Sequence, residues 1–318
     1  MDEQVKNFGL IGVAGYIAVR HLNAIKETGN RLLASLDPFD SVGIIDSYFP
    51  ESDFFVEFER FDRHFEKLKR AGTRFDYVSI CSPNYMHDSH IRFALRQQAD
   101  AICEKPVVLN PWNIDALMEI EKETEKKVYT VLQLRLHPSI IELKRKIEKE
   151  TDGRVHDIDL TYITSRGNWY HFSWKGDIQK SGGVATNIGI HFFDMLTWIF
   201  GEAKSVNVHL SKPDKAAGYM ELEKARVRWF LSLDSSDLPA EIVSRGQRTY
   251  RSVKIEEEEM EFSGGFTDLH TETYRDILSG RGYGLADAKH SVEIAHKIRN
   301  AAPDTLYGEI HPLAKKLL

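Results

Sequence analysis

The stretch Phe8-Gly9-Leu10-Ile11-Gly12-Val13-Ala14-Gly15-Tyr16-Ile17-Ala18 joins an apolar strand to a glycine-containing turn and then to an amphipathic segment. Small residues in such a turn let the backbone approach a pyrophosphate, which meets free N–H groups and the positive end of a helix dipole. A strict G-x-G-x-x-G pattern is not met, because positions 14 and 17 hold Ala14 and Ile17; Gly12-x-x-Gly15-x-x-Ala18 fits with one extra residue. The stretch predicts a dinucleotide-binding turn with these contacts: Gly12, Ala14, Gly15, Tyr16 and Ile17.

The first third of the chain repeats this alternation of short apolar runs and amphipathic stretches, which is typical of βαβ units. Candidate strands are Phe8–Gly12, Arg31–Leu36, Tyr77–Cys81, Asp100–Cys103 and Val128–Leu132. Candidate helices are Ile17–Thr28, Phe61–Ala71, His87–Gln98 and Pro111–Lys126. We therefore predict an α/β chain whose residues 1–132 form a Rossmann domain, a parallel sheet with helices on its faces.

Residues 133–318 have a different texture, with longer β-like runs and fewer helices. We predict an α+β domain with a large, open, mostly antiparallel sheet, joined to the first by a short hinge. Its elements are helices His137–Glu150 and Asn187–Phe200 and the runs Val155–Thr164, Ser205–Leu210, Tyr219–Leu233 and Thr249–Ile255. A one-sided sheet leaves apolar residues uncovered, so we expect its exposed face to pair with another subunit in a homo-oligomer, a tetramer in preference to a dimer.

Composition limits the class of protein. The 318 residues suit two domains at roughly 150 residues each. The net charge of −6 argues against nucleic-acid binding, and the longest apolar run, Gly9–Val19, is too short to span a membrane. With no signal-peptide pattern at the N-terminus, we expect a cytoplasmic protein. Two cysteines, Cys81 and Cys103, are too few for a thiolate zinc site and should be buried; we predict no metal.

Asp37 ends the second predicted strand, about 25 residues after Gly12. A carboxylate there accepts hydrogen bonds from an adenosine ribose diol and repels a 2′-phosphate, which favours NAD over NADP. The alternative is a plain turn residue before Pro38.

Glu104-Lys105-Pro106 follows another strand, at the sheet edge where doubly wound folds bind ligands. A lysine ammonium beside a sugar hydroxyl stabilises the alkoxide that develops as the proton leaves, and Pro106 could fix the turn through a cis bond. The alternative is a surface lysine in a tight turn.

Asn187 and His191 are four residues apart, after the pair Gly182-Gly183, and would share one face of a helix. Histidine is the natural proton acceptor at neutral pH, and glycines let a ligand come close. A core histidine is the alternative.

The loop from Arg166 to Asp177 is dense in aromatics and cations, which suits a large anionic ligand as well as it suits a packing loop. Its candidate substrate contacts are Arg166, Trp169, Tyr170, Trp174 and Lys175. His87 and His90 suggest a metal, but with no third ligand evident we interpret them as helix-start residues, and we interpret Glu256–Glu259 as a solvated hairpin tip with no assigned role.

Together these segments resemble the Gfo/Idh/MocA family of NAD(P)-dependent sugar oxidoreductases over nearly the whole chain. Glu104-Lys105-Pro106 is similar to the family's E-K-P signature, and Gly182-Gly183 through His191 to its catalytic stretch. The run Cys81-Ser82-Pro83-Asn84-x-x-His87 is similar to its cofactor loop. The resemblance implies further cofactor contacts at Cys81, Ser82, Pro83, Asn84, His87, Glu104 and Lys105.

Within the family, the start of the chain and the Arg166–Asp177 loop look most like UDP-N-acetyl-2-amino-2-deoxyglucuronate 3-dehydrogenases of lipopolysaccharide O-antigen synthesis. The resemblance implies that NAD takes a hydride from the sugar 3-carbon, giving a 3-keto sugar, and that 2-oxoglutarate is a candidate partner for recycling NADH. Asn187 replaces the aspartate of many relatives, and an amide cannot act as a base. We therefore expect His191, which we also count among the substrate contacts, to take the proton, Lys105 to polarise the hydroxyl and Asn187 to orient it. Alternatives are a dehydrogenase of a free sugar or cyclitol, redox-neutral elimination with tightly held NAD, and a catalytically silent cofactor-binding regulator.

Overall fold

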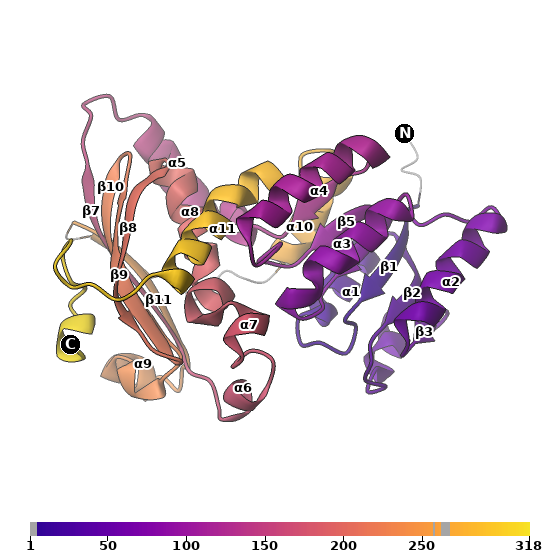
Figure 1. The fold of residues 1–318 in the computed structure, drawn as a ribbon, viewed down its shortest axis with the longest axis horizontal. Helices are drawn as coiled ribbons and strands as arrows, with labels where there is room; N and C mark the ends of the chain where they lie inside the picture. Colours follow the sequence, from indigo (N-terminus) through magenta and orange to yellow (C-terminus); the bar gives the residue numbers. More distant parts are fainter. Residues whose placement is uncertain (1–4, 257, 262–267) are drawn as a thin grey trace. The chain divides into compact units, whose positions relative to one another are not determined.

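The computed structural model describes residues 5–256, 258–261 and 268–318. The chain folds into two compact units, each with its own sheet (Figure 1). The first unit comprises Met1–Gln133 and Asp268–Lys289, and the second comprises Leu134–Thr267 and His290–Leu318. A single division near residue 132 was expected, whereas residues 268–289 also belong to the first unit.

The sheet of the first unit has six parallel strands in the order β3-β2-β1-β4-β5-β6. This order is that of a doubly wound dinucleotide-binding sheet, with the reversal of winding between β1 and β4, so the predicted Rossmann fold is confirmed. The edge strand β3 was not predicted, because its three residues include a charged one and are all at least partly exposed, so they form no buried apolar run. The strands are β1 (Asn7–Ile11), β2 (Arg31–Leu36), β3 (Asp53–Phe55), β4 (Tyr77–Ile80), β5 (Asp100–Cys103) and β6 (Val128–Thr130).

Alternate residues of the buried strands pack on opposite faces of this sheet. Phe8 lies in a cluster with Leu22 of α1 and Tyr274 of α10, whereas a Cβ on the adjacent Gly9 would lie 2.7 Å from the Phe65 ring of α2. Helices therefore cover both faces of the first sheet, as the fold requires. The helices of this unit are α1 (Ala18–Glu27), α2 (Phe58–Arg70), α3 (His87–Arg96), α4 (Pro111–Thr124) and α10 (Leu269–Leu278).

The sheet of the second unit is mixed and mostly antiparallel, as predicted, in the order β12-β11-β7-β10-β9-β8 with one parallel pair, β7 and β10. The predicted single run Tyr219–Leu233 is wrong: it is two antiparallel strands joined at Glu223-Lys224, because two polar residues between buried strands are enough for a hairpin turn. The strands are β7 (His156–Thr164), β8 (Ala203–Ser211), β9 (Lys215–Leu222), β10 (Ala225–Ser232), β11 (Thr249–Ile255) and β12 (Glu258–Glu261).

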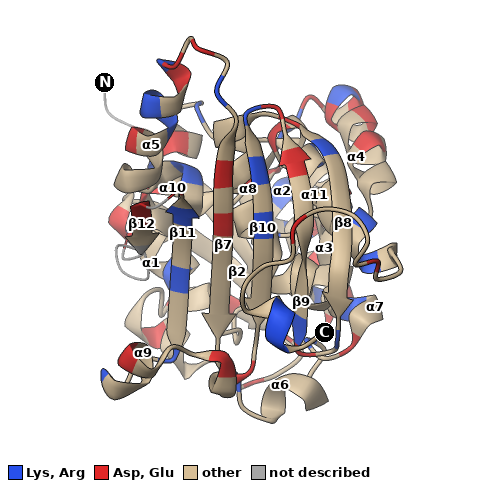
Figure 2. Ribbon diagram, turned by 90° about the vertical axis from the view of Figure 1, so that its left-hand side faces the viewer, with Lys and Arg blue, Asp and Glu red and all other residues tan. Residues whose placement is uncertain are grey.

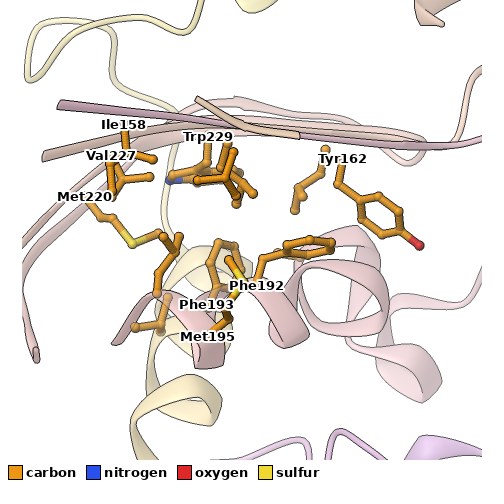
Figure 3. Close-up of a cluster of buried hydrophobic side chains, with 14 of the residues drawn as sticks. Ile158, Tyr162, Phe192, Phe193, Met195, Met220, Val227 and Trp229 are labelled. Carbon is orange, nitrogen blue, oxygen red and sulfur yellow. The ribbon is translucent and has the colours of Figure 1, made fainter. Parts of the chain in front are cut away.

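One face of the second sheet packs on α8 and forms the core of this unit. Phe192, Phe193 and Met195 of α8 meet Met220, Val227 and Trp229 of the strands (Figure 3). Trp229 is fully buried with its ring 5.6 Å from that of Phe193. The other helices of this unit are α5 (Pro138–Glu148), α6 (Trp169–Phe172), α7 (Ile178–Ser181), α8 (Ile190–Phe200), α9 (Ala240–Ser244) and α11 (Leu285–Asn300), whose first residues belong to the first unit.

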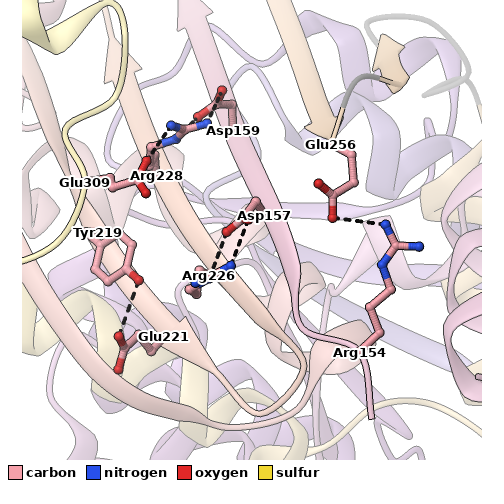
Figure 4. A network of polar contacts seen from close by, with 9 residues as sticks. All are labelled: Arg154, Asp157, Asp159, Tyr219, Glu221, Arg226, Arg228, Glu256 and Glu309. Atoms are coloured by element: carbon pink, nitrogen blue, oxygen red, sulfur yellow. Dashed lines mark hydrogen bonds and ion pairs between the residues drawn. The ribbon is translucent and has the colours of Figure 1, made fainter. Parts of the chain in front are cut away.

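The other face of the second sheet carries ion pairs over one part and apolar residues covered by the C-terminal segment over another, which differs from the expected uncovered apolar surface. Arg226 and Arg228 of β10 pair with Asp157 and Asp159 of β7 (Figures 2 and 4). The C-terminal segment covers another part of this face, where Ala314 packs on Ile163 and Phe230. Outward-facing carboxylates on one strand that pair with arginines on the next need no apolar cover, because ion-paired side chains stay hydrated.

Two further expectations concern particular segments. Within the described ranges, no helix is long and apolar enough to cross a membrane. The predicted hairpin tip lies between β11 and β12, where Ile255 pairs with Glu258; Glu257 lies outside the described residues.

Candidate functional site

The glycine turn of the first unit is built for close approach. Gly12 directly follows β1 with φ +90°, a conformation that favours glycine, and a Cβ there would lie 2.6 Å from the carbonyl carbon of Cys81. Helix α1 begins at Ala18 with no side-chain cap from Ile17. The backbone N–H groups of Gly12, Gly15 and Ala18 donate to the carbonyls of Leu36, Gly12 and Gly15, so these amides hold the turn, and the glycines give the room that a pyrophosphate needs. Tyr16, the most exposed of the predicted contacts, lies on the turn with 90% of its surface accessible.

Asp37 directly follows β2 and holds this turn. Its Oδ2 accepts from the backbone N–H of Ala14 at 2.9 Å, and Oδ1 accepts from that of Phe39 at the same distance. The amide of Ala14 is therefore bonded to Asp37. Each carboxylate oxygen has a second lone pair, so the residue can still accept from a ribose hydroxyl.

The loop after β4 is tied to the turn after β5 through His87. Its Nδ1 lies 2.7 Å from the carbonyl oxygen of Pro106, and its Nε2 lies 2.8 Å from that of Ser82. The ring is fully buried, and this burial lowers its pKa. Both ring nitrogens thus face the protein backbone, so His87 positions the predicted cofactor loop. Helix α3 begins at His87, and His90 contacts Ser82 Oγ at 2.8 Å, as expected for helix-start residues.

Lys105 is the one accessible side chain of a buried stretch. Every other residue of 101–108 is buried, including Cys103, and the Lys105-Pro106 peptide bond is cis, as the sequence analysis suggested. Cys81 and Cys103 are free and buried, which confirms their expected burial and raises the pKa of both thiols. The turn therefore presents a lysine from a fixed backbone at the carboxyl end of the sheet.

Glu104 lies below this turn in a buried cluster that the sequence analysis missed. Its Oε1 lies 3.0 Å from Nε2 of His21 and 2.9 Å from Nε2 of His270. Burial alone would raise the pKa of Glu104, but the bonds from the two histidines hold that pKa well below its usual value. His21 Nδ1 lies 2.7 Å from the hydroxyl of Tyr274, which lies 2.6 Å from Ser79 Oγ. The histidines are distant from Glu104 in sequence, so no local pattern could reveal the cluster.

The stretch of the second unit that is predicted to be catalytic begins with two left-handed glycines. Gly182 has φ +82° and Gly183 has φ +77°, and a Cβ on Gly182 would lie 2.6 Å from the Thr186 side chain. The predicted continuous helix from Asn187 is wrong in detail: Ala185–Gly189 form a π-helical turn before α8. π-Turns recur at functional sites because they re-aim side chains.

Asn187 and His191 are the two accessible side chains of this stretch. All other residues from 184 to 196 are buried in the structure. The wider π-turn replaces the simple helical face that the spacing predicted, and both polar side chains still reach the surface. The amide of Asn187 donates from Nδ2 to the hydroxyl of Tyr170 at 2.5 Å.

The aromatic loop places its predicted substrate contacts unevenly. Tyr170 is buried, and this burial raises the pKa of its phenol, which stays protonated. The Lys175 ammonium stacks 4.0 Å over the ring of Trp174. Arg166 and Trp169 are exposed. The structure thus joins Tyr170 to Asn187 and leaves cationic and aromatic groups accessible beside them in the sequence.

Helix α8 is anchored by a buried ion pair next to His191. The guanidinium group of Arg135 donates to both carboxylate oxygens of Asp194, at 2.7 and 3.0 Å. Both side chains are less than 7% exposed. Asp194 lies three residues after His191, so the pair fixes the turn of helix that carries the predicted base.

Comparison with known proteins defines the class to which this fold and these residues belong. Residues 6–132 match the oxidoreductase family with an NAD-binding Rossmann fold (Gfo/Idh/MocA), and residues 144–243 match its C-terminal alpha/beta domain. The chain belongs to this family of oxidoreductases.

Two solved structures resemble the chain along its length. The WlbA (WbpB) dehydrogenase from Thermus thermophilus, in complex with NAD and alpha-ketoglutarate, is 52% identical with a TM-score of 0.94, covering 97% of this chain and 99% of that one. The same dehydrogenase in complex with NAD and UDP-GlcNAcA is 51% identical with a TM-score of 0.93, at the same coverage. Inositol 2-dehydrogenase of Rhizobium meliloti is 28% identical over 61% of this chain, and the match spans about half, 55%, of that curated relative.

Proposed function

We propose that this protein is an NAD-dependent dehydrogenase that oxidises the 3-hydroxyl of UDP-N-acetyl-2-amino-2-deoxy-D-glucuronate (UDP-GlcNAcA) to the 3-keto sugar, a step in nucleotide-sugar synthesis for O-antigen or related polysaccharides. The observation that carries the proposal is the 51–52% identity, over 97% of this chain, with a dehydrogenase solved with NAD and with UDP-GlcNAcA. The glycine turn, Asp37 and the Lys105 turn suit NAD, and an accessible histidine supplies a base.

The chain's own residues account for the proton side of the reaction. The imidazole of His191 takes the proton of the 3-hydroxyl, and the Lys105 ammonium stabilises the alkoxide that develops. The Asn187 amide, held by Tyr170, orients that hydroxyl. NAD, when bound, accepts the hydride from the 3-carbon.

The remaining predicted residues divide between the two ligands. Arg166 and Lys175 suit the diphosphate and carboxylate charges of a UDP-uronic acid, and Trp169 and Trp174 offer faces on which a sugar or base can stack. A free sugar or cyclitol would make no use of these local cations in a chain of net charge −6.

Recycling of the cofactor by 2-oxoglutarate is part of the proposal. The complex of the Thermus dehydrogenase with NAD and alpha-ketoglutarate supports it. In the balanced step, the ketone carbon of 2-oxoglutarate gains the hydride from NADH and its oxygen gains a proton, giving 2-hydroxyglutarate and NAD.

The first experiment is anaerobic absorbance at 340 nm after purified protein meets UDP-GlcNAcA, with and without added NAD, followed by 2-oxoglutarate. A rise that 2-oxoglutarate reverses is the expected result. A flat trace with NAD bound would contradict the proposal and point to another sugar, redox-neutral chemistry or a regulator. His191→Asn and Lys105→Met should each abolish turnover while NAD still binds; an active His191→Asn protein would refute the assigned base.

Two properties stay predictions, a cytoplasmic location and a homo-oligomer with a tetramer favoured. The ion-paired part of the second sheet offers no uncovered apolar surface, so the oligomer prediction has to be tested directly. Light scattering coupled to size exclusion measures the oligomer directly.

A further inference from the structure

The cluster below the Lys105 turn joins four elements of the first unit. Ser79 comes from β4, Glu104 follows β5, His21 lies in α1, and His270 and Tyr274 lie in α10. All five side chains are less than 10% exposed. Buried polar groups are costly unless hydrogen-bonded, so such a cluster has a defined arrangement of donors and acceptors.

The hydrogen bonds run in one direction and end on the carboxylate. An ionised carboxylate only accepts, so Nε2 of His21 and Nε2 of His270 both donate to Glu104 Oε1. Burial keeps His21 neutral by lowering its pKa, so its Nδ1 accepts from the hydroxyl of Tyr274. Tyr274 then accepts from Ser79.

The other carboxylate oxygen reaches the residue that carries the predicted chemistry. Glu104 Oε2 accepts from the backbone N–H of Lys105 at 3.3 Å. The orientation of the carboxylate, set by the two histidines at Oε1, therefore acts on the backbone from which the Lys105 side chain projects.

We propose that His270, carried by α10, is a positioning residue that fixes the Glu104 carboxylate and, through it, the backbone of Lys105. The proposal rests on the proposed function for the role of Lys105. It also gives α10, which follows the second unit's strands in sequence but belongs to the first unit, a part in building the reactive turn. His270 enters the cluster through Nε2 alone, because within the described residues its buried Nδ1 has no hydrogen-bond partner.

The test compares variants of His270 in the full chain. His270→Leu keeps the bulk and removes the donor, and it should slow single-turnover reduction of NAD by about 10- to 100-fold, the scale of small misplacements at an active site. NAD affinity should stay within about threefold, so the loss falls on kcat. His270→Gln restores an N–H donor and should recover most of the rate.

The matched control breaks another contact between α1 and α10, the helices that carry His21 and His270. Thr271 Oγ1 of α10 donates to Glu27 Oε2 of α1 at 2.9 Å, a bond in which Glu104 takes no part. Thr271→Val should therefore leave the rate within about twofold. Equal loss in Thr271→Val and His270→Leu would show a merely structural role and overturn the proposal.

A double-mutant cycle tests whether His270 acts through Glu104. If it does, Glu104→Gln combined with His270→Leu is no slower than the worse single variant, because both break one connection. Additive losses would overturn the proposal. So would a stoichiometric metal in the purified wild-type protein, since the three donor atoms lie within 4.8 Å of one another and a bound ion would replace the hydrogen bonds.

A readout without substrate separates this inference from the proposed function. Amide hydrogen exchange at Lys105 in the free protein should accelerate by about tenfold or more in His270→Leu and stay unchanged in Thr271→Val. If the wild-type protein reduces no NAD, the proposed function fails, and the exchange result alone decides whether His270 fixes the turn. Unaltered exchange in His270→Leu refutes the inference whatever the turnover.

Discussion

Asp194→Ala should destabilise the second unit far more than the loss of an ion pair at the surface would. Asp194 and Arg135 are 2% and 6% exposed and share two hydrogen bonds of 2.7 and 3.0 Å. Removing one partner of a buried pair leaves the other charge without its carboxylate, which typically costs about 3–5 kcal/mol. That is a large part of the about 5–15 kcal/mol by which a domain is stable.

Asp157→Ala is the matched control, because the same substitution breaks a pair at the surface. Asp157 and Arg226 lie 2.8 Å apart but are 47% and 50% exposed, so their loss should cost at most about 1 kcal/mol. Replacing both members of the buried pair, as Arg135→Leu with Asp194→Leu, should recover most of the stability lost in Asp194→Ala, because no buried charge is then left.

Urea unfolding followed by tryptophan fluorescence measures these differences. Four of the five tryptophans belong to the second unit, so the signal reports mainly the unit that carries the pair. His191 lies one helical turn before Asp194, so turnover of Asp194→Ala should fall at temperatures below its unfolding transition. Equal, small losses of stability in Asp194→Ala and Asp157→Ala would refute the reasoning from burial.

Three further predictions test other parts of the second unit. Tyr170→Phe removes the hydroxyl that accepts from Asn187, and stopped-flow absorbance should show kcat about tenfold lower, the equivalent of about 1.4 kcal/mol; an unchanged kcat would remove Tyr170 from the site. Gly182→Ala places a methyl group 2.6 Å from the Thr186 side chain at a residue with φ +82°. Its free energy of unfolding, measured by urea melts, should be lower by about 1–3 kcal/mol, and an unfolding midpoint equal to that of the wild-type protein would contradict this strain. Burial lowers the pKa of His311 to about 3, so as pH falls below about 6.5 the unfolded chain takes up a proton on this histidine before the folded chain does. The free energy of unfolding from urea melts should therefore fall by about 2 kcal/mol between pH 8 and pH 5, and His311→Gln should not show this fall.

The first unit was predictable because each of its inner strands is a short apolar run bounded by turn residues. The predicted strand Arg31–Leu36 and the start of α3 at His87 agree with the structure residue for residue. The hairpin of β9 and β10 was not resolved, since both strands are buried and the turn offers only Glu223-Lys224 as a signal. The exposed charges of β7 and β10 were visible in the sequence as alternation, but their pairing depends on a parallel register between distant strands.

The candidate site likewise contains residues that could be predicted from the sequence and residues that could not. Lys105, Asn187 and His191 could be selected because their neighbours in sequence, a proline and two glycines, mark special turns. His21 and His270 could not, because they meet Glu104 across 83 and 166 residues of chain. A buried histidine within an apolar helix face gives no sign of which carboxylate it will contact.

The candidate residues of both units share one feature, an accessible side chain within a stretch that is otherwise buried. Lys105, and likewise Asn187 and His191, are accessible side chains in segments that are otherwise buried. Packing on both sides fixes the backbone at these positions, so the polar ends are held in place before any ligand arrives. Preorganised groups need no rearrangement as charge develops, which is how these residues would lower the barrier of the proposed reaction. The buried partners, Glu104 below one segment and Asp194 beside the other, should therefore affect turnover through position, and conservative replacements that keep their hydrogen bonds should restore it.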